Sequence, residues 1–282
     1  QDKWSTKDPV ENFELFLKNE GIIDDAYIES KTEEIKKEIN DALEISFAEP
    51  NVPIDTEFEL NDLYKPFDFQ ETSPATDNKS DKRLIDAISD GLKQSMEKYE
   101  NSVIMGQDIA EYGGVFKITE GFLEAFGKER VRNTPICESA IVGAALGLSM
   151  KGYKAIMEMQ FADFVTVGFN QIVNNLAKLH YRWGENADVV VRMPTGAGVA
   201  AGPFHSQSNE AWFTHTPGLK VVYPAFPGEA KGLLAAAIED PNPVIFFEHK
   251  ALYRSISEEV SDDYYTTEIG KAALVSEGND VS

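Results

Sequence analysis

The stretch RNTPICESAIVGAALGLSMKG, residues 132–152, contains the junction on which the fold depends. After Glu138, small residues alternate with aliphatic ones, which predicts a tightly packed helix over 139–151. The residues before Glu138 read as a strand that ends in a turn. One carboxylate thus stands in apolar surroundings, where burying a charge is costly. It can be a first-turn acid that interacts with the helix dipole, which the spacing alone favours, or a functional acid at the end of a strand.

Short apolar runs alternate with helical patterns on both sides of this stretch. Predicted strands cover 102–106, 154–159, 188–194, 219–224 and 243–249, and predicted helices cover 84–98, 139–151, 162–181 and 227–238. Such alternation is typical of βαβ units around a parallel sheet that is buried on both faces. We therefore expect an α/β fold in which helices flank a parallel sheet, preceded by a small helical segment.

The N-terminal part of the chain has a different character. Asp8 and Pro9 begin one predicted helix as its N-cap and first residue, and a second helix is predicted from Thr32 to Ala48. Two short, acidic helices lack the apolar area that a stable domain needs, so we expect them to dock on another surface. The polar segment 68–83 reads as a linker.

The composition excludes several classes of function. The chain has 282 residues and a formal net charge of −22, and residues 1–80 carry 21 of its 48 acidic residues. This charge argues against nucleic acid as a partner, because phosphate binding needs Lys and Arg. A single cysteine, no signal-peptide pattern and no membrane-length apolar run favour a reducing, cytoplasmic compartment and no membrane partner. The ends, QDKW and EGNDVS, read as cut points within a longer protein.

Three polar residues fall just after predicted strands or in the following loops, where open parallel sheets bind ligands: Glu138, Gln160 and His205. His205 lies in the loop AGPFHSQSNEAW (201–212) beside small polar residues, a setting typical of catalytic histidines, although an ordinary surface histidine is the alternative. The segment TGAGVAAG (195–202) fails the dinucleotide-binding pattern, because Ala stands where the third glycine is required. Cys137 has no base near it in sequence, and no Cys/His cluster has zinc spacing.

Longer motifs carry a family resemblance. They are GQDIAEYGGVFKITEGFLEAFG (106–127), TPICESAIVGAALGLSMKGYKAIMEMQFADF (134–164), HSQSNEAWFTHTPGLKVVYP (205–224) and DPNPVIFFEHKALYR (240–254). Together they resemble the beta chain of thiamine diphosphate-dependent 2-oxo acid dehydrogenases, in the family's order over residues 81–282. Residues 1–67 are similar to the carboxyl-terminal tail of the alpha chain. The resemblance implies a fused alpha–beta chain, as in some bacteria, of which this sequence is a fragment.

The same resemblance implies a division of the chain into four parts. Residues 1–67 would be the helical alpha tail and 68–83 the linker. Residues 84–262 would be a transketolase-like pyrimidine-binding domain, and 263–282 the start of a truncated C-terminal transketolase-like domain.

The resemblance also assigns roles at individual positions. In the family, the glutamate at the position of Glu138 hydrogen-bonds a nitrogen of the cofactor's aminopyrimidine ring, which promotes removal of a proton from the thiazolium carbon. Ile136, Gln160 and Phe164 match residues that line the pyrimidine pocket, whereas the helical spacing of Phe164 alone predicts a core residue. His205 matches a histidine that assists proton transfer when the acyl group passes to a lipoyl arm.

A metal site is implied less directly. Asp240 and Asn242 match a loop that holds a monovalent cation, K⁺, in some members of the family. A proline-containing turn explains the sequence EDPNP equally well. Mg²⁺ would be held by the alpha chain's diphosphate-binding domain.

The implied enzyme decarboxylates a 2-oxo acid with thiamine diphosphate and reductively acylates the lipoyl domain of its acyltransferase partner. The motifs QFADF, HSQS and FFEHKALYR favour branched-chain 2-oxo acids, and pyruvate is the alternative substrate. Because the family's cofactor lies between domains of different chains, we expect a homo-oligomer with the helix 139–151 near a subunit contact, and an inactive isolated fragment. A non-catalytic assembly module is the alternative from a different functional class.

Overall fold

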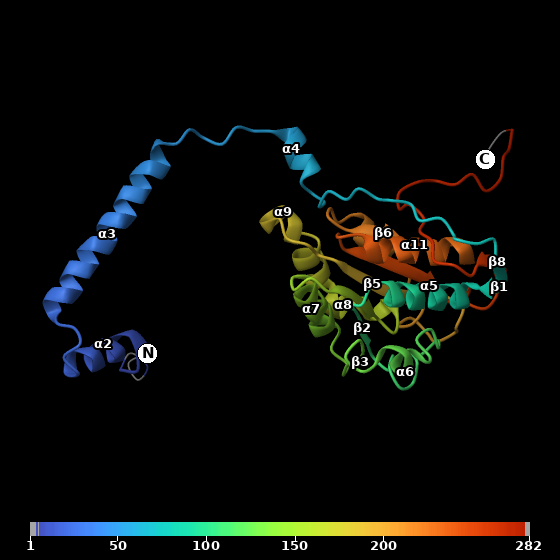
Figure 1. Cartoon of the computed structure of the whole chain (residues 1–282), viewed down its shortest axis with the longest axis horizontal. Coiled ribbons are helices and arrows are strands. Elements are labelled where there is room, and N and C mark those ends of the chain that lie inside the picture. Colours follow the sequence, from blue (N-terminus) through green and yellow to red (C-terminus); the bar gives the residue numbers. More distant parts are fainter. Residues whose placement is uncertain (1–3, 5, 280–282) are drawn as a thin grey trace. The chain divides into compact units, whose positions relative to one another are not determined.

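The computed structural model describes residue 4 and residues 6–279 of the chain (Figure 1). It divides into two compact units, Gln1–Asp55 and Thr56–Ser282. The second unit contains the sheet and every site residue predicted from the sequence. No helix in the described part of the chain is both long enough and apolar enough to cross a membrane.

The described part of the first unit includes the helices α2 (Pro9–Asn19) and α3 (Asp25–Ala48). The Asp8 carboxylate accepts hydrogen bonds from two backbone N–H groups in the first turn of α2, at 2.8 and 3.2 Å, as the sequence predicts. Helix α3 begins earlier than the predicted start at Thr32, because the Asp24 side chain caps it at 2.7 Å. No residue of α2 or α3 is buried, so the two helices have no core of their own.

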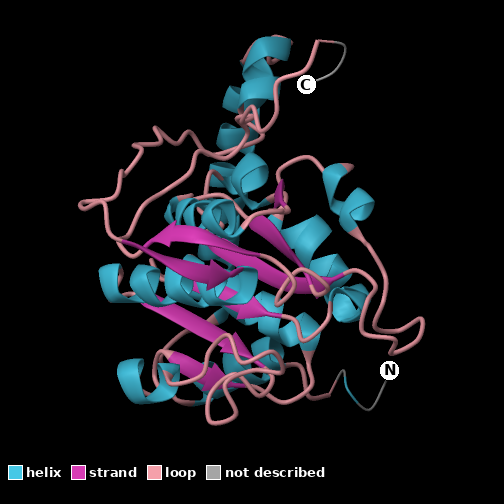
Figure 2. Cartoon of the chain, turned by 90° about the vertical axis from the view of Figure 1, so that its right-hand side faces the viewer, coloured by secondary structure: helices cyan, strands magenta, loops and turns pink. Residues whose placement is uncertain are grey.

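Six parallel strands form the central sheet of the second unit, in the order β3-β2-β4-β5-β7-β6 (Figure 2). The strands are β2 (Ser102–Gly106), β3 (Val131–Asn133), β4 (Lys154–Glu158), β5 (Val189–Thr195), β6 (Lys220–Val222) and β7 (Val244–His249). Their positions closely match the predicted apolar runs. The predicted α/β architecture with a parallel sheet is therefore confirmed.

Helices cover both faces of this sheet, as expected for strands that are apolar throughout. The main covering helices are α5 (Leu84–Lys98), α7 (Glu138–Ser149), α8 (Val165–Asn170) and α11 (Pro227–Glu239), and shorter helices are α4 (Thr56–Asn61), α6 (Phe122–Phe126) and α10 (Glu210–Thr214). Val103 and Met105 of β2 belong to the core beneath α7 and α8, while Ile104 between them belongs to the core beneath α5 and α11. This alternation follows from the two-residue period of a strand.

The helix predicted over 162–181 is a series of four segments rather than one continuous helix. They are the 3₁₀ turn η1 (Ala162–Phe164), α8, the π-helical η2 (Gln171–Leu176) and α9 (Leu179–Trp183). In the π-helical part the Ala177 N–H donates to the Ile172 carbonyl at 2.9 Å, five residues back. The wider turn brings the Ala177 carbonyl against Gly218, where an added Cβ would lie 1.9 Å from the oxygen.

The segment predicted as a linker, 68–83, contains a strand. Strand β1 (Lys79–Arg83) pairs antiparallel with β8 (Ser257–Ser261) in a separate two-stranded sheet, with Lys79 opposite Ser261. The pairing is supported at its end by an ion pair of 2.8 Å between Lys82 and Asp262. These strands are polar because the small sheet is largely exposed, so the segment lacks the apolar alternation that would have predicted a strand.

The residues that follow IGKAALV, which read as the start of a strand, lie partly outside the described residues. Residues 271–279, which the structure does describe, have no regular secondary structure. The compact second unit begins at Thr56, upstream of the predicted boundary at residue 84. One cause is Asn242, whose side chain accepts a hydrogen bond from the Lys65 N–H at 2.7 Å and donates to the Lys65 carbonyl at 3.0 Å.

Candidate active site

The predicted site residues follow the carboxyl ends of neighbouring parallel strands. Glu138 follows β3, Gln160 follows β4, and His205 lies in the loop after β5. Because all these strands run in the same direction within one sheet, their carboxyl ends meet at one edge. The structure therefore brings the three residues to the same edge of the sheet.

Glu138 is the first residue of α7 and is only 7% exposed. The N-cap, Cys137, makes no side-chain hydrogen bond to the helix and is a half-buried free thiol. The Glu138 carboxylate therefore provides the negative charge at the positive end of the helix. One of its oxygens, Oε1, accepts a long hydrogen bond of 3.4 Å from Gln107 Nε2. Glu138 can therefore interact with the helix dipole and also take part in a functional site.

Gln107 and Asp108 are site residues that the sequence analysis missed. They follow directly after β2, and Asp108 Oδ2 accepts a hydrogen bond of 3.0 Å from Gln160 Nε2. Asp108 has a φ of +58°, which is uncommon for a residue other than glycine and often marks functional sites. Together the two residues connect Glu138 to Gln160. The signal was available, because both are polar residues that immediately follow a buried strand.

Aromatic rings surround His205. Its imidazole meets the Phe161 ring nearly at right angles, with centroids 4.7 Å apart, and the Phe164 ring in the same way at 5.4 Å. Both phenylalanines are half-buried and line this edge, so Phe164 does not lie in the core that its helical spacing predicts. The imidazole Nδ1 is buried and has no hydrogen-bond partner among the described residues. A bound molecule or a water molecule within hydrogen-bond distance would satisfy this nitrogen.

The His205 loop is held at its base. The Gln207 carbonyl accepts hydrogen bonds from the Gly196 N–H at 2.9 Å and from Thr195 Oγ1 at 3.1 Å. On the other side, Asn209 Nδ2 donates to the Ala162 carbonyl at 2.9 Å. The loop is therefore fixed to the end of β5 and to the turn that follows β4.

Ile136 is the most exposed of the predicted site residues, at 83%. It lies between β3 and α7, two residues before Glu138. An aliphatic side chain that is open to solvent beside a buried carboxylate offers an apolar surface next to a hydrogen-bond acceptor. This combination suits a flat heteroaromatic ring that has a polar edge.

Residues 81–255 match the family model described as transketolase, pyrimidine binding domain, which covers more than half of the chain. The chain belongs to this family. Its pyrimidine-binding domain accounts for the six-stranded sheet and for all of the site residues at the sheet edge.

Several curated proteins are similar to this pyrimidine-binding domain. The 2-oxoisovalerate dehydrogenase subunit beta of Bacillus subtilis is 48% identical over 200 residues, which are 70% of this chain and 61% of that protein. The mitochondrial 2-oxoisovalerate dehydrogenase subunit beta of Dictyostelium discoideum is 48% identical over 71% of this chain and 54% of its own. The pyruvate dehydrogenase E1 component subunit beta of Staphylococcus aureus is 42% identical over 71% and 62%. The chain thus spans about three fifths of the length of these relatives.

A buried cluster of charges lies within the sheet of the pyrimidine-binding domain. Arg192 of β5 is 0% exposed and donates to Glu158 of β4 at 2.7 Å and to both carboxylate oxygens of Glu248 of β7 at 2.8 and 3.0 Å. The Tyr253 hydroxyl donates to Glu248 at 2.6 Å. Burial raises the pKa of Glu158, an effect that Arg192 opposes and Glu248 reinforces. The cluster connects the adjacent strands β4, β5 and β7; Gln160 follows the first of them and the His205 loop follows the second.

Asp240 and Asn242 lie elsewhere, after α11, and both are buried. The Asp240 carboxylate forms an ion pair with the Lys220 ammonium and accepts hydrogen bonds from Asn242, whose amide clamps the Lys65 backbone. The predicted K⁺ site gains no support from these contacts, because a lysine already neutralises the carboxylate. Within residues 4 and 6–279, no group of three His, Cys, Asp or Glu side chains is placed to hold a metal ion.

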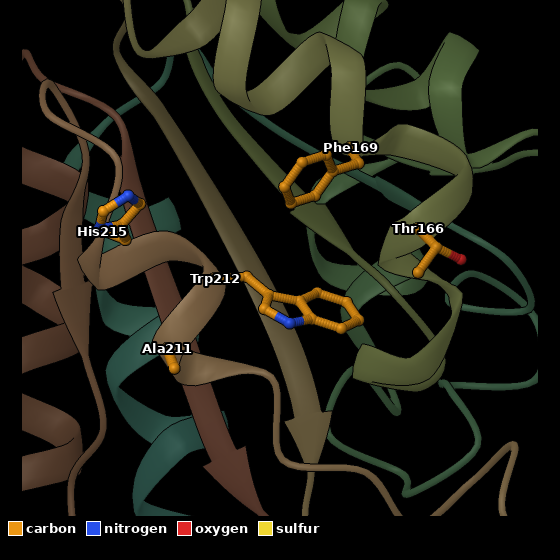
Figure 3. A pocket seen from close by; sticks show the side chains of 5 residues that line it. All are labelled: Thr166, Phe169, Ala211, Trp212 and His215. Carbon is orange, nitrogen blue, oxygen red and sulfur yellow. The ribbon is translucent and has the colours of Figure 1, made fainter.

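A separate apolar cavity of about 530 Å³ lies between α8 and α10 (Figure 3). Thr166, Phe169, Ala211, Trp212 and His215 line it, and the rings of Phe169 and Trp212 meet nearly at right angles with centroids 6.1 Å apart. None of the residues predicted from the sequence for a catalytic or binding role lines this cavity. The chemistry considered below therefore belongs to the sheet edge and not to this cavity.

Proposed function

We propose that this chain is part of the E1 component of a thiamine diphosphate-dependent 2-oxo acid dehydrogenase, and that its substrate is a branched-chain 2-oxo acid. The observation that carries the proposal is the buried Glu138 carboxylate at the sheet edge of a pyrimidine-binding domain. The higher identity to the 2-oxoisovalerate relatives, 48% against 42% for the pyruvate relative, supports the branched-chain substrate. Pyruvate is the alternative.

The residues at the sheet edge fit an aminopyrimidine ring. Glu138 offers a carboxylate, Ile136 an exposed aliphatic surface, Gln160 an amide and Phe164 a half-buried ring. When bound, thiamine diphosphate would supply a thiazolium carbon that, once deprotonated, adds to the carbonyl carbon of the 2-oxo acid. Glu138 would hydrogen-bond the pyrimidine edge, while Ile136 and Phe164 would contact and orient the ring.

His205 is assigned the second half of the reaction. Its imidazole is oriented by Phe161 and Phe164, and it carries a buried nitrogen with no partner in the described chain. We assign to it proton transfer when the acyl group passes to a lipoyl domain, which would be the macromolecular partner. The chemistry suits a histidine, whose pKa lies near neutrality.

The remaining assignments extend the proposal to the whole protein. Residues 1–67 would be an alpha-chain tail fused to the beta part, 84–262 the pyrimidine-binding domain, and 263–282 the start of a further domain. The unburied helices α2 and α3 support docking of this tail on another surface. Mg²⁺ and the diphosphate would be held by a separate domain, in a cytoplasmic bacterial enzyme.

A homo-oligomer fits the surface of α7. Small residues face outward along this helix: Ala140, Ala144 and Gly147 are exposed and Gly143 is half-exposed. Small side chains let two backbones approach closely, so this face would suit a subunit contact. Full solvent exposure of these residues in the assembled enzyme would contradict that placement.

The test uses the full-length enzyme assembled with its diphosphate-binding partner, and it replaces Glu138 alone. Glu138→Ala should abolish decarboxylation of 2-oxo acids, measured with an artificial electron acceptor, while circular dichroism stays close to that of the parent. Glu138→Gln keeps the shape of the side chain and should also fail, because it cannot share a proton. The matched control is Glu124→Ala, which removes an exposed first-turn acid of α6 and should leave turnover unchanged.

Turnover above one tenth of the parent in Glu138→Ala would refute the assignment. A comparison of kcat/KM for a branched-chain 2-oxo acid and for pyruvate decides between the two substrates. Titration of the complex with thiamine diphosphate tests the non-catalytic alternative, because an assembly module would not bind the cofactor.

A further inference from the structure

Asp163 holds the loop that carries His205. Its carboxylate is buried, at 6% exposure, and Oδ1 accepts hydrogen bonds from the Ser206 and Gln207 backbone N–H groups, each at 3.1 Å. These two amides directly follow His205 in the chain. The second oxygen, Oδ2, is buried without a hydrogen-bond partner among the described residues. An ionised carboxylate binds N–H groups more strongly than a neutral one, so the hold on the loop depends on the charge of Asp163.

Lys250 is an unpaired cation close to this loop. It follows β7, its N–H donates to the Thr195 carbonyl at 3.0 Å, and its side chain is 5% exposed. The ammonium is buried and has no hydrogen-bond partner in the described residues. It lies 5.4 Å from the centroid of Phe161, the same ring that His205 contacts. Burial lowers the pKa of Lys250, and the charge of Asp163 opposes that change.

Another buried lysine, Lys231, has the hydrogen-bond partners that the Lys250 ammonium lacks among the described residues. Lys231 is 1% exposed, and its ammonium donates to Asp90 and to the Ser261 carbonyl, both at 2.7 Å. A buried charge without such partners is costly unless an opposite charge compensates it. For Lys250, the opposite charge is that of Asp163, whose Oδ2 is likewise buried without a hydrogen-bond partner among the described residues.

We propose that Lys250 is a positioning residue for His205, acting through the Phe161 ring against which the imidazole packs and as the countercharge of the buried Asp163 carboxylate that fixes the His205 loop. The proposal rests on the proposed function for its kinetic consequences, although the positioning itself does not. Lys250 acts on His205 by two routes. Its charge interacts favourably with the Asp163 carboxylate that holds Ser206 and Gln207, and it lies over the Phe161 ring against which the imidazole packs.

The first test is spectroscopic and needs no activity. The chain contains four histidines, so ¹³C-histidine labelling of the full chain gives few resonances, and His205→Asn assigns the one from His205. Lys250→Met should shift or broaden the His205 resonance and leave that of His180 unchanged. Lys231→Met, the matched buried lysine, should not affect His205. An unchanged His205 resonance in Lys250→Met would overturn the proposal.

The second test separates the two half-reactions in the assembled enzyme. Acyl transfer to a lipoyl domain should fall about tenfold or more in Lys250→Met, since small displacements of a catalytic group cost one to two orders of magnitude. Decarboxylation followed with an artificial acceptor should stay within about twofold of the parent. Equal losses in both half-reactions would overturn the proposal. Absence of decarboxylation in the parent enzyme would instead refute the proposed function, and the spectroscopic test would still stand.

A double-mutant cycle tests whether Lys250 acts through Asp163. Asp163→Asn keeps an oxygen that can accept the two N–H bonds and removes only the charge. If Lys250 also serves as the countercharge, Lys250→Met should reduce acyl transfer less in the Asp163→Asn background than in the parent, since only the route through the Phe161 ring remains. Multiplication of the two single effects would contradict the coupling. The double variant also avoids the uncompensated carboxylate that could unfold Lys250→Met alone.

Discussion

Replacing Arg192 with methionine would remove the cation from the buried cluster in the sheet. Arg192 is fully buried and donates three hydrogen bonds, of 2.7, 2.8 and 3.0 Å, to Glu158 and Glu248. Removing one partner of a buried ion pair typically costs about 3–5 kcal/mol, because the remaining charge is left uncompensated. Here two carboxylates lose the same partner, so we expect the free energy of unfolding at pH 8 to fall by at least this amount. Methionine fills part of the space, which keeps the cavity contribution small.

The loss should depend on pH in a defined direction. The pKa of Glu158 is already raised by burial in the intact protein, and Arg192 opposes that rise. Without Arg192, the folded-state pKa moves further above that of the unfolded chain. A group of this kind contributes stability at low pH that is lost as the pH rises through the folded pKa. The deficit of Arg192→Met relative to the parent should therefore be smaller at pH 5 than at pH 8.

Equilibrium urea unfolding, followed by circular dichroism at both pH values, measures these differences. The control is the triple variant Arg192→Met, Glu158→Gln and Glu248→Gln, which removes the charges together. Replacing a whole buried ionic cluster by neutral groups is often close to neutral, so the triple variant should recover most of the loss. A deficit below about 1 kcal/mol for Arg192→Met, or a triple variant no more stable than it, would refute the reasoning.

Two further changes test the fold. Burial raises the pKa of Asp188 to about 6, against the opposing charge of Lys154, so its contribution to stability is lost as the pH rises through 6. The variant Asp188→Asn has no carboxyl group and does not undergo that loss. The amount by which it is less stable than the parent in urea unfolding should therefore be about 1.4 kcal/mol smaller at pH 8 than at pH 5. An equal stability difference at both pH values would contradict the raised pKa. Gly218→Ala should cost about 3 kcal/mol or more, because φ is +89° and the new Cβ would lie 1.9 Å from the Ala177 carbonyl. Gly184→Ala, with φ of +68° and open space around it, should cost only about 1 kcal/mol in the same thermal or urea measurement, and equal costs would argue against the clash.

The central sheet could be predicted because its strands are buried on both faces. Runs such as SVIMG and PVIFFEH are too short and too continuously apolar for an amphipathic helix, and helical patterns separate them along the chain. The pairing of β1 with β8 could not be predicted in this way, since the residues of both strands are mostly polar and the two strands are far apart in sequence. Long-range pairing of exposed strands leaves little trace in local composition.

The site was predictable in part. Glu138 and His205 were found because they follow strand ends, but spacing alone favoured a dipole role for the first, and family resemblance decided its interpretation. Gln107 and Asp108 follow a strand in the same way and were overlooked. The role of Arg192 can be recognised only when the strand order is known, because its partners Glu158 and Glu248 lie on the two strands that flank its own. That order is a property of the tertiary fold.

The antiparallel pairing of β1 with β8 has a consequence for how this domain could spread among genes. The strand that enters the α/β unit and the strand that leaves it lie side by side. A domain whose first and last strands are neighbours can be inserted between other domains, or joined to a neighbouring reading frame, without a change in its internal fold. Another polypeptide segment could then be attached at this strand pair through a short connecting peptide.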